Sequence, residues 1–164
     1  MRNRMLVGLI AVVAIMMATA VAASVTFTPP DSSKAVDMMT IKLEPQKAVP
    51  KASGTASLIC NKGNTKHVLT IEAKGLDPKK VYTVWFVKMV KKDGKEMPVM
   101  EGVGKAPYTL KVDKKGNAKM TYNPSECPAM QGWQMLEIVE HVDKNAKNMA
   151  MKNLVPVLMG KMKM

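Results

Sequence analysis

Residues 69–87 read LTIEAKGLDPKKVYTVWFV, and this stretch decides the fold class of the chain. Leu69 and Ile71 alternate with polar residues, which is the period-two pattern of a half-buried β-strand. Gly75–Pro78 then interrupts the pattern with turn residues. The residues that follow, Val81–Met89, are apolar on both faces and predict a central strand that is covered on both sides.

Similar short segments lie on both sides of this stretch. They are separated by turn sequences, of which Lys91–Gly94 is a hairpin-type turn and Lys114–Asn117 is another. Met97–Pro107 is irregular, and we expect the chain to cross there from one sheet to the other. No segment after the first 22 residues carries a helical stripe. The sequence predicts an all-β fold, an antiparallel immunoglobulin-like or Greek-key β-sandwich of about seven to nine short strands.

The stretch Leu69–Val87 also resembles a strand–turn–strand segment of known exported sandwiches. That segment has the pattern Gly-Leu-x-Pro-x-x-x-Tyr-x-Val-Trp, and the C-terminal domain of anti-sigma-K factors carries a similar one. Fibronectin type III domains share the shorter Leu-x-Pro-x-x-x-Tyr part. The resemblance implies a β-sandwich and no particular activity. The matching positions are Gly75, Leu76, Pro78, Tyr82, Val84 and Trp85.

Residues 1–22 have the organisation of an export signal peptide. Two arginines precede the apolar stretch Met5–Met17, and Ala20-Val21-Ala22 provides small residues for cleavage. We expect a periplasmic or extracellular protein with no transmembrane segment once the signal is removed. The alternative is an uncleaved anchor, because the 19 residues Met5–Ala23 are long enough to span a membrane.

The rest of the chain divides into two parts by composition. Residues 23–53 are rich in proline and predict an N-terminal tether, within which Val36–Leu43 could add an edge strand. Residues 54–164 are expected to form the β-sandwich domain. In the last predicted strand, Leu154–Met159, Pro156 removes a hydrogen-bond donor, so we place that strand at an edge.

Composition limits the possible functions. The chain has 25 Lys+Arg against 13 Asp+Glu, but both arginines lie in the signal segment. Lysine lacks the planar group that reads bases bidentately, so we expect no specific nucleic-acid partner. No nucleophile–base pair is visible, and Glu137 and Glu140 point to opposite faces of one strand. The sequence therefore predicts a protein that is not an enzyme.

Cys60 and Cys127 are the two cysteines of the chain. In an exported protein they predict one disulfide bond. The alternatives are two free buried thiols or a thiol pair on a soft metal ion.

Methionine is unusually frequent, with 17 residues in the chain. Clustered thioethers with an occasional histidine suit Cu(I) or Ag(I), because soft ligands select soft ions. The alternative is that methionine fills the core and that His141 forms a solvated pair with Glu140. The candidate metal ligands are His141, Met149, Met151, Met159, Met162 and Met164.

Lysines gather at the turns, and these turns could contact a polyanion. The alternative is a solvated rim that blocks pairing between sheet edges. Trp85 and Trp133 are expected in the core, or at a partner contact if exposed. The candidate polyanion contacts are Lys91, Lys92, Lys95, Lys114 and Lys115.

Together these features predict an exported, non-catalytic binding or structural module of the periplasm or cell envelope, whose partner is an envelope protein or a polyanion. The alternative function is soft-metal binding, with Cu(I) or Ag(I) held by the clustered methionines.

Overall fold

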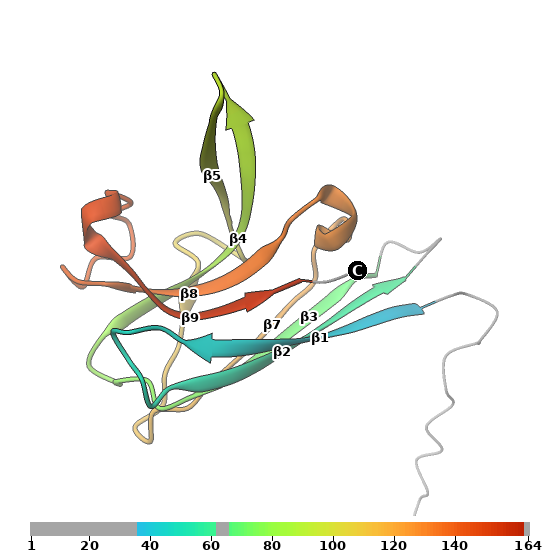
Figure 1. Cartoon of the computed structure of the whole chain (residues 1–164). Helices are drawn as coiled ribbons and strands as arrows, with labels where there is room; N and C mark the ends of the chain where they lie inside the picture. The colour runs from blue at the N-terminus through green and yellow to red at the C-terminus, as the bar shows by residue number, and fades with distance from the viewer. Residues whose placement is uncertain (1–35, 62–65, 163–164) are drawn as a thin grey trace, which may run out of the picture. The chain divides into compact units, whose positions relative to one another are not determined.

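The computed structural model describes residues 36–61 and 66–162, so the predicted signal segment lies outside the described residues. These residues form nine β-strands and two short 3-10 helices, and the predicted all-β class is confirmed (Figure 1). The elements are β1 (Val36–Pro45), β2 (Ser53–Asn61), β3 (Val68–Lys74), β4 (Val81–Lys92), β5 (Lys95–Gly102), β6 (Thr109–Leu110), β7 (Ala118–Tyr122), η1 (Pro128–Gln131), β8 (Met135–His141), η2 (Met151–Asn153) and β9 (Leu154–Lys161).

One antiparallel, hydrogen-bonded path joins the strands in the order β5-β4-β8-β9-β1-β2-β3-β7, and β6 pairs with β4. Strand β1 links the two halves of this curled sheet. Its residues from Val36 to Leu43 pair with β2, whereas Glu44 and Pro45 pair with β9. One half therefore contains β1, β2, β3 and β7, and the other contains β4, β5, β6, β8 and β9.

Two strands that we expected at an edge are interior strands. Strand β1 lies between β9 and β2, so the expectation of an edge strand in a tether is wrong. The boundary expected at residue 54 consequently falls inside the folded sheet. Strand β9 lies between β8 and β1. Pro156 is accommodated there because it pairs with Val139, where the register between β8 and β9 shifts in a bulge.

The expected crossover at Met97–Pro107 is also wrong. Most of its first half belongs to β5, and both β5 and β6 pair with β4 in the same half of the sheet. Pro98 and Gly102 hide the strand pattern in the sequence, and proline is tolerated because β5 is an edge strand. The chain changes halves in three other connections, β3–β4, β6–β7 and β7–β8.

The core is formed by side chains from both halves of the sheet. Leu58 and Ile71 from one half share a buried cluster with Val84, Ile138 and Leu158 from the other. A second, smaller cluster lies on the opposite face of β4 and β8 and contains Trp85, Val87 and Val139. Strand β4 is therefore covered on both faces along Tyr82–Val87, as the sequence predicted, but not as far as Met89, which is exposed.

Cys60 and Cys127 form a disulfide bond, with their Cα atoms 5.5 Å apart. The bond connects β2 to the segment that enters η1, and 67 residues separate the two cysteines in the sequence. This confirms the predicted pairing over the two thiol alternatives.

Candidate functional site

The most prominent surface feature is the free end of the β4–β5 hairpin. Strand β4 pairs with β8 only as far as Val87, whereas its pairing with β5 continues to Lys92. At its base this end of the hairpin contacts the segment before β8, where the Met89 amide donates to Gln134 Oε1 at 3.0 Å. Beyond that base, no strand other than β4 and β5 pairs with residues 88–99, and Figure 1 shows the hairpin projecting from the rest of the sheet. We call residues 88–99 the arm.

The sequence at the tip of the arm explains the hairpin. Asp93 and Gly94 are the two central turn residues, with φ angles of 51° and 77°. A two-residue turn with both φ angles positive matches the twist of the flanking strands and favours Asp-Gly. The predicted hairpin-type turn is therefore confirmed.

The two faces of the arm differ in charge. On one face, which we call the cationic face, the directly opposite pairs are Lys88 with Val99, Val90 with Met97, and Lys92 with Lys95. On the other face, Met89 lies opposite Pro98, and Lys91 lies opposite Glu96. The cationic face thus has an apolar centre with lysines on both sides, while the other face has a complementary pair of charges.

Apolar side chains on the arm are open to solvent. Met97 is 49% exposed, Val99 is 38% exposed and Met89 is 37% exposed. At the base of the cationic face, the Lys88 ammonium lies 4.5 Å from the centre of the Trp133 ring. Trp133 is buried and stacks on Phe86 at 6.1 Å between ring centres. The core therefore ends at Trp133, and the arm continues beyond it.

The structure divides the predicted polyanion contacts into two groups. Lys91, Lys92 and Lys95 come together at the tip of the arm. Lys114 and Lys115 lie in the β6–β7 connection, where the Leu76 amide donates to the Gly116 carbonyl at 3.1 Å. That connection adjoins the start of β4, roughly 35 Å from the tip at about 3.3 Å per residue. The five lysines therefore do not form one site.

Three residues, Thr83, Trp85 and His141, form a buried polar cluster on the face of β4 and β8 that carries the smaller apolar cluster. The Trp85 Nε1–H donates to Thr83 Oγ1 at 2.8 Å, and Thr83 Oγ1 lies 2.9 Å from His141 Nε2. His141 is only 1% exposed, and its Nδ1 has no hydrogen-bond partner among the described residues. Glu140 is buried on the opposite face and binds the Lys80 ammonium at 2.9 Å. The expected solvated His141–Glu140 pair is therefore wrong.

Glu137 is a functional candidate that the sequence did not reveal. It lies directly opposite Trp85 on β4 and Met159 on β9, and it is 7% exposed. Burial alone raises the pKa of this carboxyl above its ordinary value. The sequence of β8 alone gave no sign of this burial, because the residues that cover Glu137 belong to the neighbouring strands β4 and β9.

An aromatic pair covers one side of Trp85. The Tyr108 ring meets the Trp85 ring edge-on, with 5.0 Å between ring centres and 71° between planes. Tyr108 has a φ angle of 64°, which is a costly conformation for a bulky residue. A Cβ atom on Gly102 would lie 2.4 Å from the Tyr108 ring, so glycine is required there.

The predicted metal ligands are spread over different parts of the structure. His141 lies opposite Leu154 at the start of β9, and Met159 lies opposite Glu137, about 13 Å along the strand at 3.3 Å per residue. Met162 packs against the main core, Met149 and Met151 are exposed between β8 and β9, and Met164 lies outside the described residues. Within residues 36–61 and 66–162, no three His, Cys, Asp or Glu side chains are grouped so that they could hold a metal ion.

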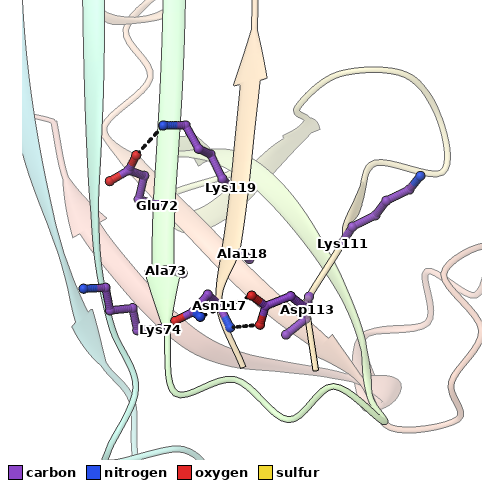
Figure 2. A pocket seen from close by; sticks show the side chains of 9 residues that line it. Glu72, Ala73, Lys74, Lys111, Asp113, Asn117, Ala118 and Lys119 are labelled. Carbon is purple, nitrogen blue, oxygen red and sulfur yellow. Dashed lines mark hydrogen bonds and ion pairs between the residues drawn. The ribbon is translucent and has the colours of Figure 1, made fainter. Parts of the chain in front are cut away.

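A shallow hollow of about 440 Å³ lies between β3 and the β6–β7 connection (Figure 2). Its two carboxylates, Glu72 and Asp113, both have partners. The Lys119 ammonium binds the Glu72 carboxylate at 2.7 Å, and Asp113 accepts hydrogen bonds from the amides of Lys115 and Asn117, each at 2.8 Å. These contacts lower the pKa of Glu72 and that of Asp113. No buried polar atom among the residues that line the hollow lacks a partner, so the hollow does not indicate a ligand.

Comparison with known proteins gives no relative from which a function could be transferred: no family model, no curated protein and no solved structure matches this chain. In the described part of the chain, no helix is long and apolar enough to cross a membrane.

Proposed function

We propose that this chain is an exported, non-catalytic binding module of the periplasm or cell envelope, and that the arm is its binding element. The observation that carries the proposal is the projection of exposed apolar side chains and lysines beyond the end of the core. A structure that only had to be stable would not gain from exposing Met97 and Val99 on a hairpin without packing partners. Export is supported by the disulfide bond, which is typical of oxidising compartments.

The charge of the arm indicates an anionic partner. Lys88, Lys92 and Lys95 lie on one face, and the nearest carboxyl group on that face is Glu101, opposite Phe86 at the base. Asp93 is the one carboxyl group in the turn between Lys92 and Lys95, so the lysines outnumber the carboxylates at this end of the arm. Attraction to an anionic surface is screened by salt, which gives a direct test.

The test is retention of the chain from residue 23 onward on a heparin matrix, which serves as a polyanionic probe. We expect Lys92→Gln/Lys95→Gln to elute at clearly lower salt than the parent chain. Lys114→Gln/Lys115→Gln removes the same charge at the other end of β4 and is the matched control, for which we expect a smaller shift. Equal shifts for both variants would show that retention follows net charge and not the arm.

Soft-metal binding is a second candidate, and it now concerns a different set of residues. Met159 faces Glu137 across β8 and β9, and Met135 lies two residues before Glu137 on the same face. Two thioethers beside a buried carboxyl offer ligands to Cu(I). An anaerobic Cu(I) titration against a competing chelator tests this, with Met135→Leu/Met159→Leu beside Met149→Leu/Met151→Leu as control. Tight binding lost only in the first variant would support the candidate, and equal behaviour would remove it.

A further inference from the structure

The cationic face of the arm contains a contact that is unfavourable in the free protein. Lys92 and Lys95 are directly opposite each other beside the Asp93–Gly94 turn. Like charges at directly opposite positions destabilise an antiparallel pair. An anionic group placed between these ammonium groups would remove the repulsion, so the tip of the arm is suited to a negatively charged partner.

The centre of the same face is apolar; Val90 is half-buried there, and Met97 and Val99 are exposed. Val90 and Met97 are opposite each other, and Val99 follows on β5. These residues lie beyond Val87, the last β4 residue that pairs with β8. A polyanion that makes only ionic contacts would leave these side chains in water. A bilayer would contact both the lysines and the apolar centre, because headgroups and acyl chains lie next to each other there.

Lysine suits this arrangement in a way that glutamate would not. Its long apolar stem can pass along an apolar surface while the ammonium group stays at the polar level. Each lysine near an anionic membrane surface contributes about 1 kcal/mol of attraction. Lys88, Lys92 and Lys95 bracket the apolar centre from both ends of the arm.

A second copy of the chain is a poorer occupant of the same face. Pairing two arms face to face would bring the lysines of one copy against those of the other. Extension of the sheet along β5 is opposed by Pro98, which has no amide hydrogen to donate.

We propose that the arm docks on an anionic lipid bilayer, with Val90, Met97 and Val99 entering the boundary between headgroups and acyl chains and the flanking lysines contacting anionic headgroups. This rests on the proposed function, since it names the surface that the arm binds. The docked state is peripheral: the arm reaches the interface with one face of a hairpin and does not cross the bilayer.

The experiment is co-sedimentation of the chain from residue 23 onward with phosphatidylglycerol/phosphatidylcholine vesicles and with pure phosphatidylcholine vesicles, next to retention on heparin. The test variant is Val90→Ser/Met97→Ser/Val99→Ser. The matched control is Met38→Ser/Met130→Ser/Met151→Ser, which changes three exposed methionines outside the arm. The unfolding free energy of each variant is measured in urea to show that the core is intact.

We expect the parent chain and the control to bind the anionic vesicles and to bind pure phosphatidylcholine much more weakly. We expect the arm variant to lose at least tenfold in affinity for anionic vesicles while its retention on heparin is unchanged. If the arm variant binds anionic vesicles as well as the parent does, or if the parent binds heparin and no vesicles, the lipid proposal is wrong and the anionic-surface proposal remains. If the parent binds neither probe, both proposals are wrong.

Discussion

Lys92 and Lys95 lie directly opposite each other on β4 and β5, at the tip of a hairpin that no other strand supports. The fold therefore keeps two like charges next to each other at an exposed position. Residues that oppose local stability are a recurrent feature of binding elements, because they are retained for a partner and not for the fold.

Replacing one of these lysines separates the two roles. Lys95→Glu creates an opposite-charge pair with Lys92, and we expect it to stabilise the arm by about 0.2–1 kcal/mol. Hydrogen exchange of the arm amides should slow accordingly, while binding to anionic vesicles weakens. Lys95→Gln should fall between the parent and Lys95→Glu in both measurements. Faster exchange in Lys95→Glu would contradict the assigned register.

Glu137 should make stability depend on pH. Burial raises its folded-state pKa above the ordinary value of 4.5, so the folded protein holds a proton that the unfolded chain has already released. Stability from this group is therefore present below the unfolded pKa and falls as the pH rises through the folded pKa.

The measurement is urea unfolding of the parent chain and Glu137→Gln at intervals from about pH 4.5 to about pH 8. We expect the free energy of unfolding of the variant to increase relative to that of the parent as the pH rises. Above the folded-state pKa of Glu137, the difference between the two should become constant. Glu96→Gln, at an exposed position on the arm, is the control and should track the parent. Parallel curves for Glu137→Gln and the parent would show that this carboxyl is not desolvated.

Thr83 should be important for stability because its hydroxyl serves two buried partners. Thr83→Val keeps the shape of the side chain but leaves the Trp85 Nε1–H and His141 Nε2 without that oxygen. Each buried polar group left without a partner costs about 1–3 kcal/mol, so we expect a loss of roughly 2–6 kcal/mol in urea unfolding. Thr70→Val, on the solvent-facing side of β3, should change stability by much less. A similar small change at both positions would argue against the buried polar cluster.

The disulfide bond should contribute strongly to stability, because it closes a loop across 67 residues of sequence. Loop-closure entropy predicts a loss of about 4 kcal/mol when the link is removed. Cys60→Ala/Cys127→Ala should show this loss in urea unfolding, and the reduced parent chain should lose a similar amount. An unchanged unfolding midpoint after confirmed reduction would contradict the expected contribution.

Local patterns in the sequence were sufficient for most of the strands and for the arm's turn. The apolar residues of Val81–Met89 predicted a strand with two covered faces, which holds for Tyr82–Val87, and Asp93–Gly94 predicted the hairpin. Cys60 and Cys127 predicted the link between β2 and the η1 segment. The strand and the turn depend on residues that are adjacent in the sequence, and two cysteines can form only one disulfide bond. Such features can therefore be predicted from the sequence alone.

Features that depend on which strands become neighbours were not predictable in the same way. Pro156 suggested an edge strand, but a bulge opposite Val139 allows it inside the sheet. Pro98 and Gly102 concealed β5, and with it the arm. Glu137 occupies a position that local alternation assigns to solvent, and only Trp85 and Met159 from other strands bury it. The candidate site therefore emerged from strand pairing, which a single sequence does not specify.

The most direct test of the central claim is vesicle binding by a chain with a shorter arm. Deleting Val90, Lys91, Glu96 and Met97 removes two opposite residue pairs from the hairpin and keeps the turn. Because two residues are removed from each strand, every remaining side chain stays on its original face, and the net charge is unchanged. If the arm is the membrane-binding element, affinity for phosphatidylglycerol-containing vesicles should fall at least tenfold while the urea unfolding curve of the core stays the same. Equal affinity of the shortened and parent chains would show that net charge, and not the arm, brings this protein to an anionic surface.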